Sequence, residues 1–138
     1  MPRSDESDCD YLFVYGTLHP DRAPAEIADL VRRFTCAGKG TVAGTLYDLG
    51  SYPGAVLDER SPRQISGTVF RLPQGEDVLV RLDAYEEFFP EAPERSLFIR
   101  RMHGVCLDSG QTLPCWIYEY NGNTGCAAIV QNGVYSRH

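Results

Sequence analysis

The segment LDAYEEF, residues 82–88, carries two adjacent glutamates at the end of a stretch with helical spacing. Glu86 follows Leu82 by four residues, so in a helix both side chains point toward the same inward face. A carboxylate on an apolar face has a raised pKa, which suits a general base or acid near neutral pH. Glu86 is therefore a candidate catalytic residue, and the alternative is a surface glutamate at an acidic helix end. Glu87 falls on a different side of the helix and is expected to be solvated, and Asp83 is expected to be a solvated or capping residue.

A second candidate site follows the apolar segment YLFVY, residues 11–15, which stops at Gly16 and Thr17. A continuous apolar run rich in β-formers predicts a strand that is buried on both faces. Glycine permits a close approach of the backbone, and successive backbone N–H groups in such a turn can bind an anion. The corner is therefore either an anion-binding turn or an ordinary connection between a strand and a loop.

The segment FIRRM, residues 98–102, supplies the third candidate. Arg100 and Arg101 are adjacent in a predicted strand, so their side chains point to opposite faces. At most one of them reaches the interior, where it would pair with a buried carboxylate. The alternative is two surface charges beside an acidic loop.

Strands and two helices must position these residues. Helical spacing predicts helices within 23–34 and within 74–88, the second of them ending near 88–90. Apolar and β-branched segments predict strands within 11–15, 38–50, 51–63 and 64–73. Residues 97–121 predict a hairpin that turns at Asp108-Ser109-Gly110, and the tail after it is expected to be irregular. Mostly antiparallel strands with two flanking helices indicate an α+β fold, and such a sheet can close into a small barrel.

The 138 residues fit one domain, with 1–10 as a disordered acidic tail and 11–138 as the folded part. A net charge of −6 argues against nucleic acid or an anionic membrane as partner, although a local pocket can still bind a small anion. No segment approaches the roughly 20 apolar residues that span a bilayer, and the N-terminus lacks a signal-peptide pattern. We expect a cytoplasmic protein.

The cysteines and histidines show no spacing typical of a metal site or a disulfide framework. We therefore expect reduced cysteines and no metal. Cys106 and Cys115 flank the predicted hairpin turn and could face each other across it, but a functional disulfide there is not expected.

Taken together, these segments resemble the γ-glutamylcyclotransferase-like family, which includes γ-glutamylamine cyclotransferases and plant avirulence-induced proteins. The resemblance runs from about residue 11 to about residue 135. It rests on the order and spacing of FVYGTL, GTLYDLGSYPGAV, ISGTVFRL, LDAYE, FIRR and CWIYEY. It implies a small mixed β-barrel with flanking helices and a cavity at one end. It also implies a metal-free and cofactor-free reaction of the acyltransferase or lyase type, which releases 5-oxoproline and an amine from a γ-glutamyl substrate.

The resemblance also implies roles for individual residues. The family's catalytic glutamate falls on Glu86, which would act as general base and then general acid. The family's Tyr-x-Arg motif places its arginine at Arg100, a candidate substrate-binding residue. The family's opening loop holds the α-carboxylate end of the γ-glutamyl group, largely through backbone N–H groups, and it falls on Tyr15, Gly16, Thr17 and Leu18.

Two residues depart from the family pattern. Phe98 stands where the family often has tyrosine, so a hydroxyl group is missing. Glu87 stands where many members have glycine, and a second carboxylate there would raise the pKa of Glu86 or repel an anionic substrate. Phe98 therefore favours the alternative function, a non-catalytic protein that binds a small amino-acid-like ligand on the same barrel.

Overall fold

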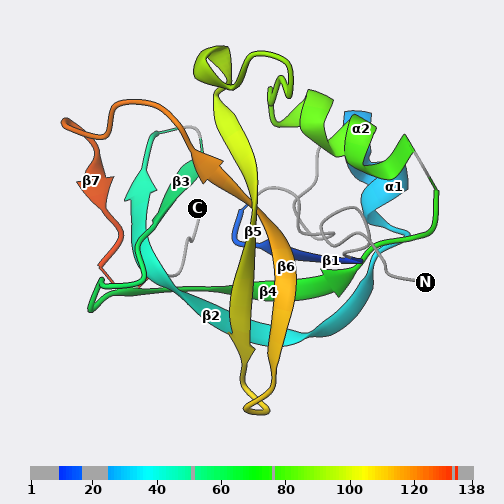
Figure 1. Cartoon of the computed structure of the whole chain (residues 1–138), viewed down its shortest axis with the longest axis horizontal. Coiled ribbons are helices and arrows are strands. Elements are labelled where there is room, and N and C mark those ends of the chain that lie inside the picture. Colours follow the sequence, from blue (N-terminus) through cyan, green and yellow to red (C-terminus); the bar gives the residue numbers. More distant parts are fainter. Residues whose placement is uncertain (1–9, 17–24, 51, 76, 132, 134–138) are drawn as a thin grey trace.

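The computed structural model describes residues 10–16, 25–50, 52–75, 77–131 and 133. Thr17 and Leu18 lie outside this part of the chain, and so does the proposed N-terminal tail apart from Asp10. The elements in chain order are β1 (Tyr11–Val14), α1 (Ala25–Val31), β2 (Thr35–Asp48), β3 (Pro53–Leu57), β4 (Gln64–Arg71), α2 (Asp77–Tyr85), the short 3-10 helix η2 (Pro93–Arg95), β5 (Phe98–Leu107), β6 (Thr112–Tyr120) and β7 (Ala128–Ile129) (Figure 1).

Five strands close into a barrel. β1 pairs antiparallel with β4, β4 with β2, β2 with β5, and β5 with β6, while β6 returns to β1 as a parallel neighbour. At one end β3 lies between β2 and β6, antiparallel to the first and parallel to the second. The expected α+β fold with a small, mixed, mostly antiparallel barrel is therefore confirmed.

The long strand β2 makes this closure possible. Its first part pairs with β4 through a register shift between Cys36 and Gly38, and its last five residues pair with β3. A bulge of this kind bends a strand and increases its twist, which lets one strand serve two parts of a curved sheet.

The interior of the barrel is one of two apolar clusters. Each barrel strand contributes to it, for example Phe13 from β1, Val42 from β2, Val69 from β4, Val105 from β5 and Ile117 from β6. These side chains are at most 4% exposed, so the interior of the barrel is filled with apolar side chains.

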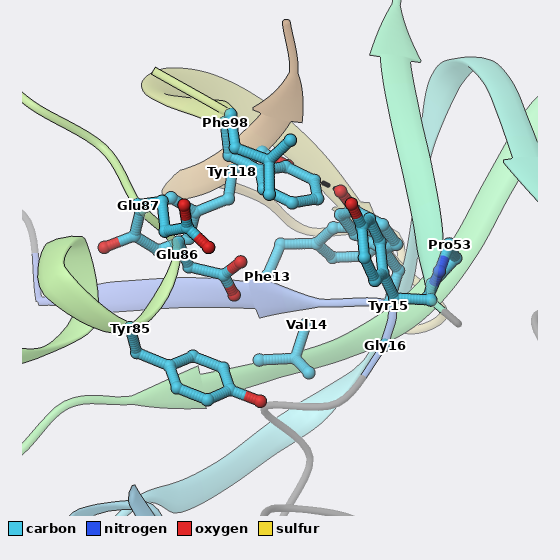
Figure 2. A pocket seen from close by; sticks show the side chains of 12 residues that line it. Phe13, Val14, Tyr15, Gly16, Pro53, Tyr85, Glu86, Glu87, Phe98 and Tyr118 are labelled. Atoms are coloured by element: carbon cyan, nitrogen blue, oxygen red, sulfur yellow. Dashed lines mark hydrogen bonds between the residues drawn. The ribbon is translucent and has the colours of Figure 1, made fainter. Parts of the chain in front are cut away.

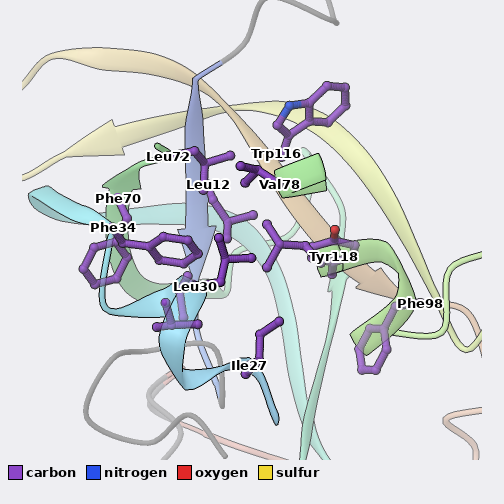
Figure 3. Close-up of a cluster of buried hydrophobic side chains, with 13 residues drawn as sticks. Leu12, Ile27, Leu30, Phe34, Phe70, Leu72, Val78, Phe98, Trp116 and Tyr118 are labelled. Carbon is purple, nitrogen blue, oxygen red and sulfur yellow. The ribbon is translucent and has the colours of Figure 1, made fainter. Parts of the chain in front are cut away.

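The second cluster lies between the outside of the barrel and the two helices (Figure 3). Leu30 of α1 and Leu82 of α2 are fully buried against Leu12 of β1. Burying such a side chain typically contributes about 1.5–3 kcal/mol. Since Leu12 faces the helices and Phe13 faces the barrel interior, β1 is buried on both faces, as its continuous apolar sequence predicts.

The predicted helices and hairpin are present, and the tail differs from its prediction. β5 and β6 form the hairpin across Asp108-Ser109-Gly110, and Gly110 has a φ of 97°. Within it Cys106 lies opposite Thr112 and Cys115 lies opposite His103, so the two cysteines do not face each other. The tail expected to be irregular contains β7, because Ala128 and Ile129 pair with the end of β2. In the described part of the chain, no helix has the length and apolar character needed to cross a membrane.

Candidate functional site at the end of helix α2

The C-terminus of α2 fixes the direction of the two glutamates. The Phe88 N–H donates to the Asp83 carbonyl at 2.9 Å, and the Glu87 N–H donates to the Ala84 carbonyl at 3.2 Å. With Glu87 at a φ of 57°, this is the Schellman pattern that satisfies the last carbonyls of a helix. Glu86 is therefore the capping residue, and its side chain is set by the final turn of α2.

A cavity of about 270 Å³ opens beside this helix end (Figure 2). It has the size of a site for a small metabolite rather than a macromolecule. The charged residues among its described lining are Glu86 and Glu87, both acidic. The lining residues are Phe13, Val14, Tyr15, Gly16, Tyr52, Pro53, Tyr85, Glu86, Glu87, Leu97, Phe98 and Tyr118.

The Glu86 carboxylate lies in a poorly solvated part of this cavity. Burial raises the pKa of Glu86 from 4.5 to about 8, because the charged form loses solvation. The negative end of the α2 dipole acts in the same direction. A carboxyl group of this kind exchanges protons near neutral pH and can serve as both acceptor and donor.

Gly16 and Tyr15 form the opposite wall of the cavity (Figure 2). Gly16 is buried, and a Cβ atom at this position would lie 2.9 Å from the Pro53 Cγ, closer than packing permits. The glycine is therefore needed for the close approach of β1 and β3. The sequence-predicted residues Gly16 and Glu86 thus line one cavity.

The Tyr15 hydroxyl, directly after β1, forms hydrogen bonds to β6 and β3. It donates to the Tyr118 carbonyl at 2.6 Å and accepts from the Ala55 N–H at 3.2 Å. Burial, and next the charge of Glu86, hold the pKa of Tyr15 well above its ordinary value, so this hydroxyl stays protonated. Both hydrogen bonds are internal, and the Tyr15 side chain acts as a rigid part of the wall.

Arg100 lies apart from the cavity lining and pairs with a carboxylate other than Glu86. Its Nε and Nη2 donate to the two carboxylate oxygens of Asp83 at 2.8 and 3.1 Å. The guanidinium also stacks 4.3 Å from the ring centroid of Trp116. Arg101 turns to the other face of β5 and pairs with Glu119, so the predicted opposite orientation of the two arginines is confirmed.

Asp83 is buried, which corrects the expectation of a solvated or capping residue. It is 7% exposed, and its Oδ1 also accepts a hydrogen bond from the Tyr118 hydroxyl at 2.7 Å. A buried carboxylate requires such partners, and here two strands supply them. Burial, and next the charge of Asp83, hold the pKa of Tyr118 well above its ordinary value. Because Tyr118 lines the cavity, this hydrogen-bonded group connects Arg100 to the site indirectly.

Aromatic residues complete the cavity wall, and of these the sequence analysis singled out Phe98 but not Tyr52 or Tyr118. Phe98, the departure from the family's tyrosine, is 6% exposed and packs between Tyr52 and Tyr120, with ring centroids 5.9 and 5.6 Å away. Tyr52 lies in the segment GTLYDLGSYPGAV and Tyr118 in CWIYEY, so their motifs were the available signal. Phe98 therefore contributes shape and apolar surface where a hydroxyl would add a polar contact.

Comparison with known proteins shows the family to which this chain is similar. The family model for gamma-glutamyl cyclotransferase, AIG2-like, matches residues 12–137. A curated relative from Niallia circulans, gamma-L-glutamyl-butirosin B gamma-glutamyl cyclotransferase, is 34% identical over 114 residues. That match covers 80% of this chain and 66% of the relative, so the chain spans less than two thirds of the relative's length.

Solved structures share the fold. An AIG2-like protein from Mus musculus superposes with a TM-score of 0.69 at 17% identity, over 92% of this chain and 88% of the mouse chain. YkqA from Bacillus subtilis gives a TM-score of 0.66 at 22% identity, over 91% of this chain and 39% of YkqA. With the match of the family model over nearly the whole chain, these findings identify this protein as a member of the AIG2-like gamma-glutamyl cyclotransferase family.

Proposed function

We propose that this protein is a γ-glutamyl cyclotransferase that converts a γ-glutamyl amide into 5-oxoproline and a free amine. The observation that carries the proposal is the Glu86 carboxylate, which has a pKa raised to about 8 and shares one cavity with Gly16. Membership of the family supports the same class of reaction.

The proposed step moves one proton and exchanges one bond for another. The substrate's α-amine attacks its own γ-carbonyl carbon, so a new C–N bond closes a five-membered ring. Glu86 accepts the proton that the attacking nitrogen loses. It then gives this proton to the departing nitrogen as the original amide C–N bond breaks. The atoms balance without a second substrate.

The raised pKa of Glu86 suits both halves of this transfer. An α-amino group at a chain end titrates at about 7.7–8.0. A carboxyl group with a pKa of about 8 therefore exchanges a proton with such an amine at little free-energy difference. A well-matched general acid or base typically contributes about 10²–10⁴-fold in rate.

The remaining predicted site residues are proposed to hold the substrate. The turn of Tyr15 and Gly16, continued by Thr17 and Leu18, would bind the α-carboxylate through backbone N–H groups. Because nucleophile and electrophile belong to one molecule, binding that bends the γ-glutamyl group toward ring closure supplies much of the catalysis. We propose that Arg100 supports binding indirectly, since it holds Asp83 and through it the Tyr118 hydroxyl at the cavity wall.

The test is 5-oxoproline release from a panel of γ-glutamyl compounds by the wild type and Glu86→Gln. The panel contains γ-glutamyl-ε-lysine, simple γ-glutamylamines, γ-glutamyl dipeptides and glutathione. Glu94→Gln is the matched control, because Glu94 is an exposed glutamate outside the cavity. We expect the wild type and the control to release 5-oxoproline and amine in equal amounts. In Glu86→Gln the rate of this release should fall by about 10²–10⁴-fold.

Equal turnover by wild type and Glu86→Gln would contradict the proposed role of Glu86. Absence of turnover across the panel, together with a thermal shift by 5-oxoproline or a γ-glutamyl ligand, would favour the alternative of a non-catalytic binding protein.

A further inference from the structure

Glu87 occupies a position that rarely carries a side chain. It is the one residue other than glycine with a positive φ in the described part of the chain, at 57°. In the Schellman pattern at the end of α2 this is the position where glycine is the usual residue. Left-handed backbone at a non-glycine residue persists where the surrounding structure holds it in place, and such residues cluster at functional sites.

Two backbone hydrogen bonds hold Glu87 there. Its N–H donates to the Ala84 carbonyl at 3.2 Å, and its carbonyl accepts from the Leu97 N–H at 3.0 Å. The described residues give the Glu87 carboxylate no ion pair and no side-chain hydrogen bond. The backbone is therefore fixed, while the carboxylate stands at the exposed edge of the cavity.

The electrostatic character of this side of the cavity is negative. Glu86 and Glu87 lie next to each other, across the cavity from Tyr15, Gly16 and Pro53 (Figure 2). Burial, and after it the charges of Tyr120, Glu87 and Glu86, raise the pKa of Tyr52, which also lines the cavity. The nearby charge of Arg100 is already paired with Asp83.

The direction of the substrate follows from the proposed function, on which this inference rests. With the γ-glutamyl group bound at Gly16 and its amide at Glu86, the departing amine extends toward the side that carries Glu87. An anionic leaving group would meet a second carboxylate there, and a cationic one would meet an opposite charge.

We propose that Glu87 selects γ-glutamyl amides whose departing group carries an ammonium in addition to the amide nitrogen. The amides of diamines and other polyamines are of this kind. The carboxylate acts at the exposed edge of the cavity, where an opposite-charge pair changes affinity by roughly two- to fivefold. Salt screens such a pair, so the preference weakens as the ionic strength rises.

Three matched substrates isolate the charge of the departing group. They are the γ-glutamyl amides of 1,4-diaminobutane, pentylamine and 4-aminobutyrate, which have similar length and end in an ammonium, a methyl and a carboxylate group. The readout is the ratio of kcat/KM for the ammonium and methyl substrates at 20 mM and 500 mM NaCl. We expect kcat/KM of the wild type to be highest for the ammonium substrate and lowest for the carboxylate substrate. The differences among the three kcat/KM values should become smaller at high salt.

Two variants separate charge from backbone conformation. Glu87→Gln removes the charge and keeps a side chain in the left-handed conformation, whereas Glu87→Gly removes both the charge and the unfavourable conformation. If charge selects the substrate, both variants lower the ammonium-to-methyl ratio by roughly two- to fivefold. Glu94→Gln, which removes an exposed charge outside the cavity, should keep the wild-type ratio.

The outcomes distinguish this inference from the proposed function. Release of 5-oxoproline with a ratio that Glu87→Gln leaves unchanged would overturn the role of Glu87 alone. A ratio that changes in Glu87→Gly and not in Glu87→Gln would assign the effect to the backbone and also overturn it. Absence of 5-oxoproline from all three amides would overturn this inference alone if another γ-glutamyl compound of the panel above is turned over. If no compound of that panel is turned over either, the proposed function fails as well.

Discussion

Two consecutive glutamates in one helix end have different environments. Glu86 caps α2 and points into a poorly solvated part of the cavity, so its pKa rises to about 8. The chain then reverses at Glu87, whose φ of 57° leaves its side chain exposed at the cavity edge. One residue of separation thus produces one carboxyl group suited to proton transfer and one that remains a surface charge.

The raised pKa of Glu86 predicts a pH-dependent stability. Its pKa is higher in the folded chain than its ordinary 4.5, so the folded state binds more protons between pH 4.5 and about 8. The stability contributed by protonation is complete below pH 4.5 and is lost as the pH rises through about 8. Glu86→Gln removes this loss. The compared quantity is the free energy of unfolding of Glu86→Gln minus that of the wild type. This difference should be larger at pH 9 than at pH 4.5 by about 1–4 kcal/mol.

Urea unfolding of the wild type and Glu86→Gln at both pH values measures this difference. Glu94→Gln serves as control, because Glu94 is exposed and should show no such pH-dependent gain. A stability difference between Glu86→Gln and the wild type that is the same at both pH values would mean that Glu86 titrates like a solvated glutamate.

The Tyr15 hydroxyl predicts a second measurable effect. Tyr15→Phe keeps the ring and removes a group that bonds both the Tyr118 carbonyl and the Ala55 N–H. Leaving such groups unsatisfied in the interior costs about 1–3 kcal/mol. Thermal unfolding should show a lower Tm, and an unchanged Tm would mean that water replaces the hydroxyl.

The spacing from Leu82 made Glu86 a candidate for an inward-facing side chain, because residues four apart share a helix face, but it left a surface glutamate as the alternative. Asp83 was expected to be a solvated or capping residue, and this expectation was wrong. Asp83 is buried because Arg100 and Tyr118 approach it from β5 and β6. Helical periodicity describes one element at a time, so it carries no information about partners that another element supplies.

At the scale of elements, α2, β5 and β6 are joined by one buried ion pair. Asp83 comes from the helix, Arg100 from β5 and Tyr118 from β6, and the hydrogen bonds among them measure 2.7 to 3.1 Å. Asp83 lies three residues before Glu86 in the chain, so this group fixes the helix end against the barrel. It thereby sets where the catalytic candidate stands.

Asp83→Asn tests this connection. The substitution leaves Arg100, whose side chain is 16% exposed, without its anionic partner. Removing one partner of a buried pair typically destabilises a protein by about 3–5 kcal/mol. Urea unfolding should show a loss of this size.

The exposed pair of Arg81 and Asp29 gives a matched control. It has similar two-bond geometry, but the side chain of Asp29 is 62% exposed. Asp29→Asn should therefore change stability far less than Asp83→Asn. Equal losses for the two variants would show that the Asp83 pair has no special importance for the fold.

The local elements could be predicted because they depend on local patterns. Two apolar, β-branched and aromatic segments on either side of the Asp-Ser-Gly turn identify the hairpin of β5 and β6, and helical spacing identifies α2. β7 was missed because two residues in a tail rich in glycine and asparagine carry no pattern of their own. They form a strand only because the end of β2 offers a free edge.

At the scale of the whole molecule, the barrel places segments distant in sequence around one cavity. β1 supplies Gly16 through the turn at its end, β3 supplies Pro53, and the end of α2 supplies Glu86. Closure depends on the parallel contact of β1 with β6 and on the contact of β2 with β5. Residue patterns predict strands but not which strands meet, so the order of motifs along the chain, through the family resemblance, was the signal for the barrel.

The measurement that tests the central claim most directly is the pH dependence of kcat/KM for 5-oxoproline release, compared between the wild type and Glu86→Gln. With Glu86 as the proton acceptor, kcat/KM of the wild type should rise with pH up to about 8 and then level off. In Glu86→Gln, kcat/KM should be lower by about 10²–10⁴-fold, and the inflection near pH 8 should be absent. Inflections caused by the substrate amine would remain in both proteins. A Glu86→Gln variant that is folded and keeps both the rate and the pH profile of the wild type would contradict the account.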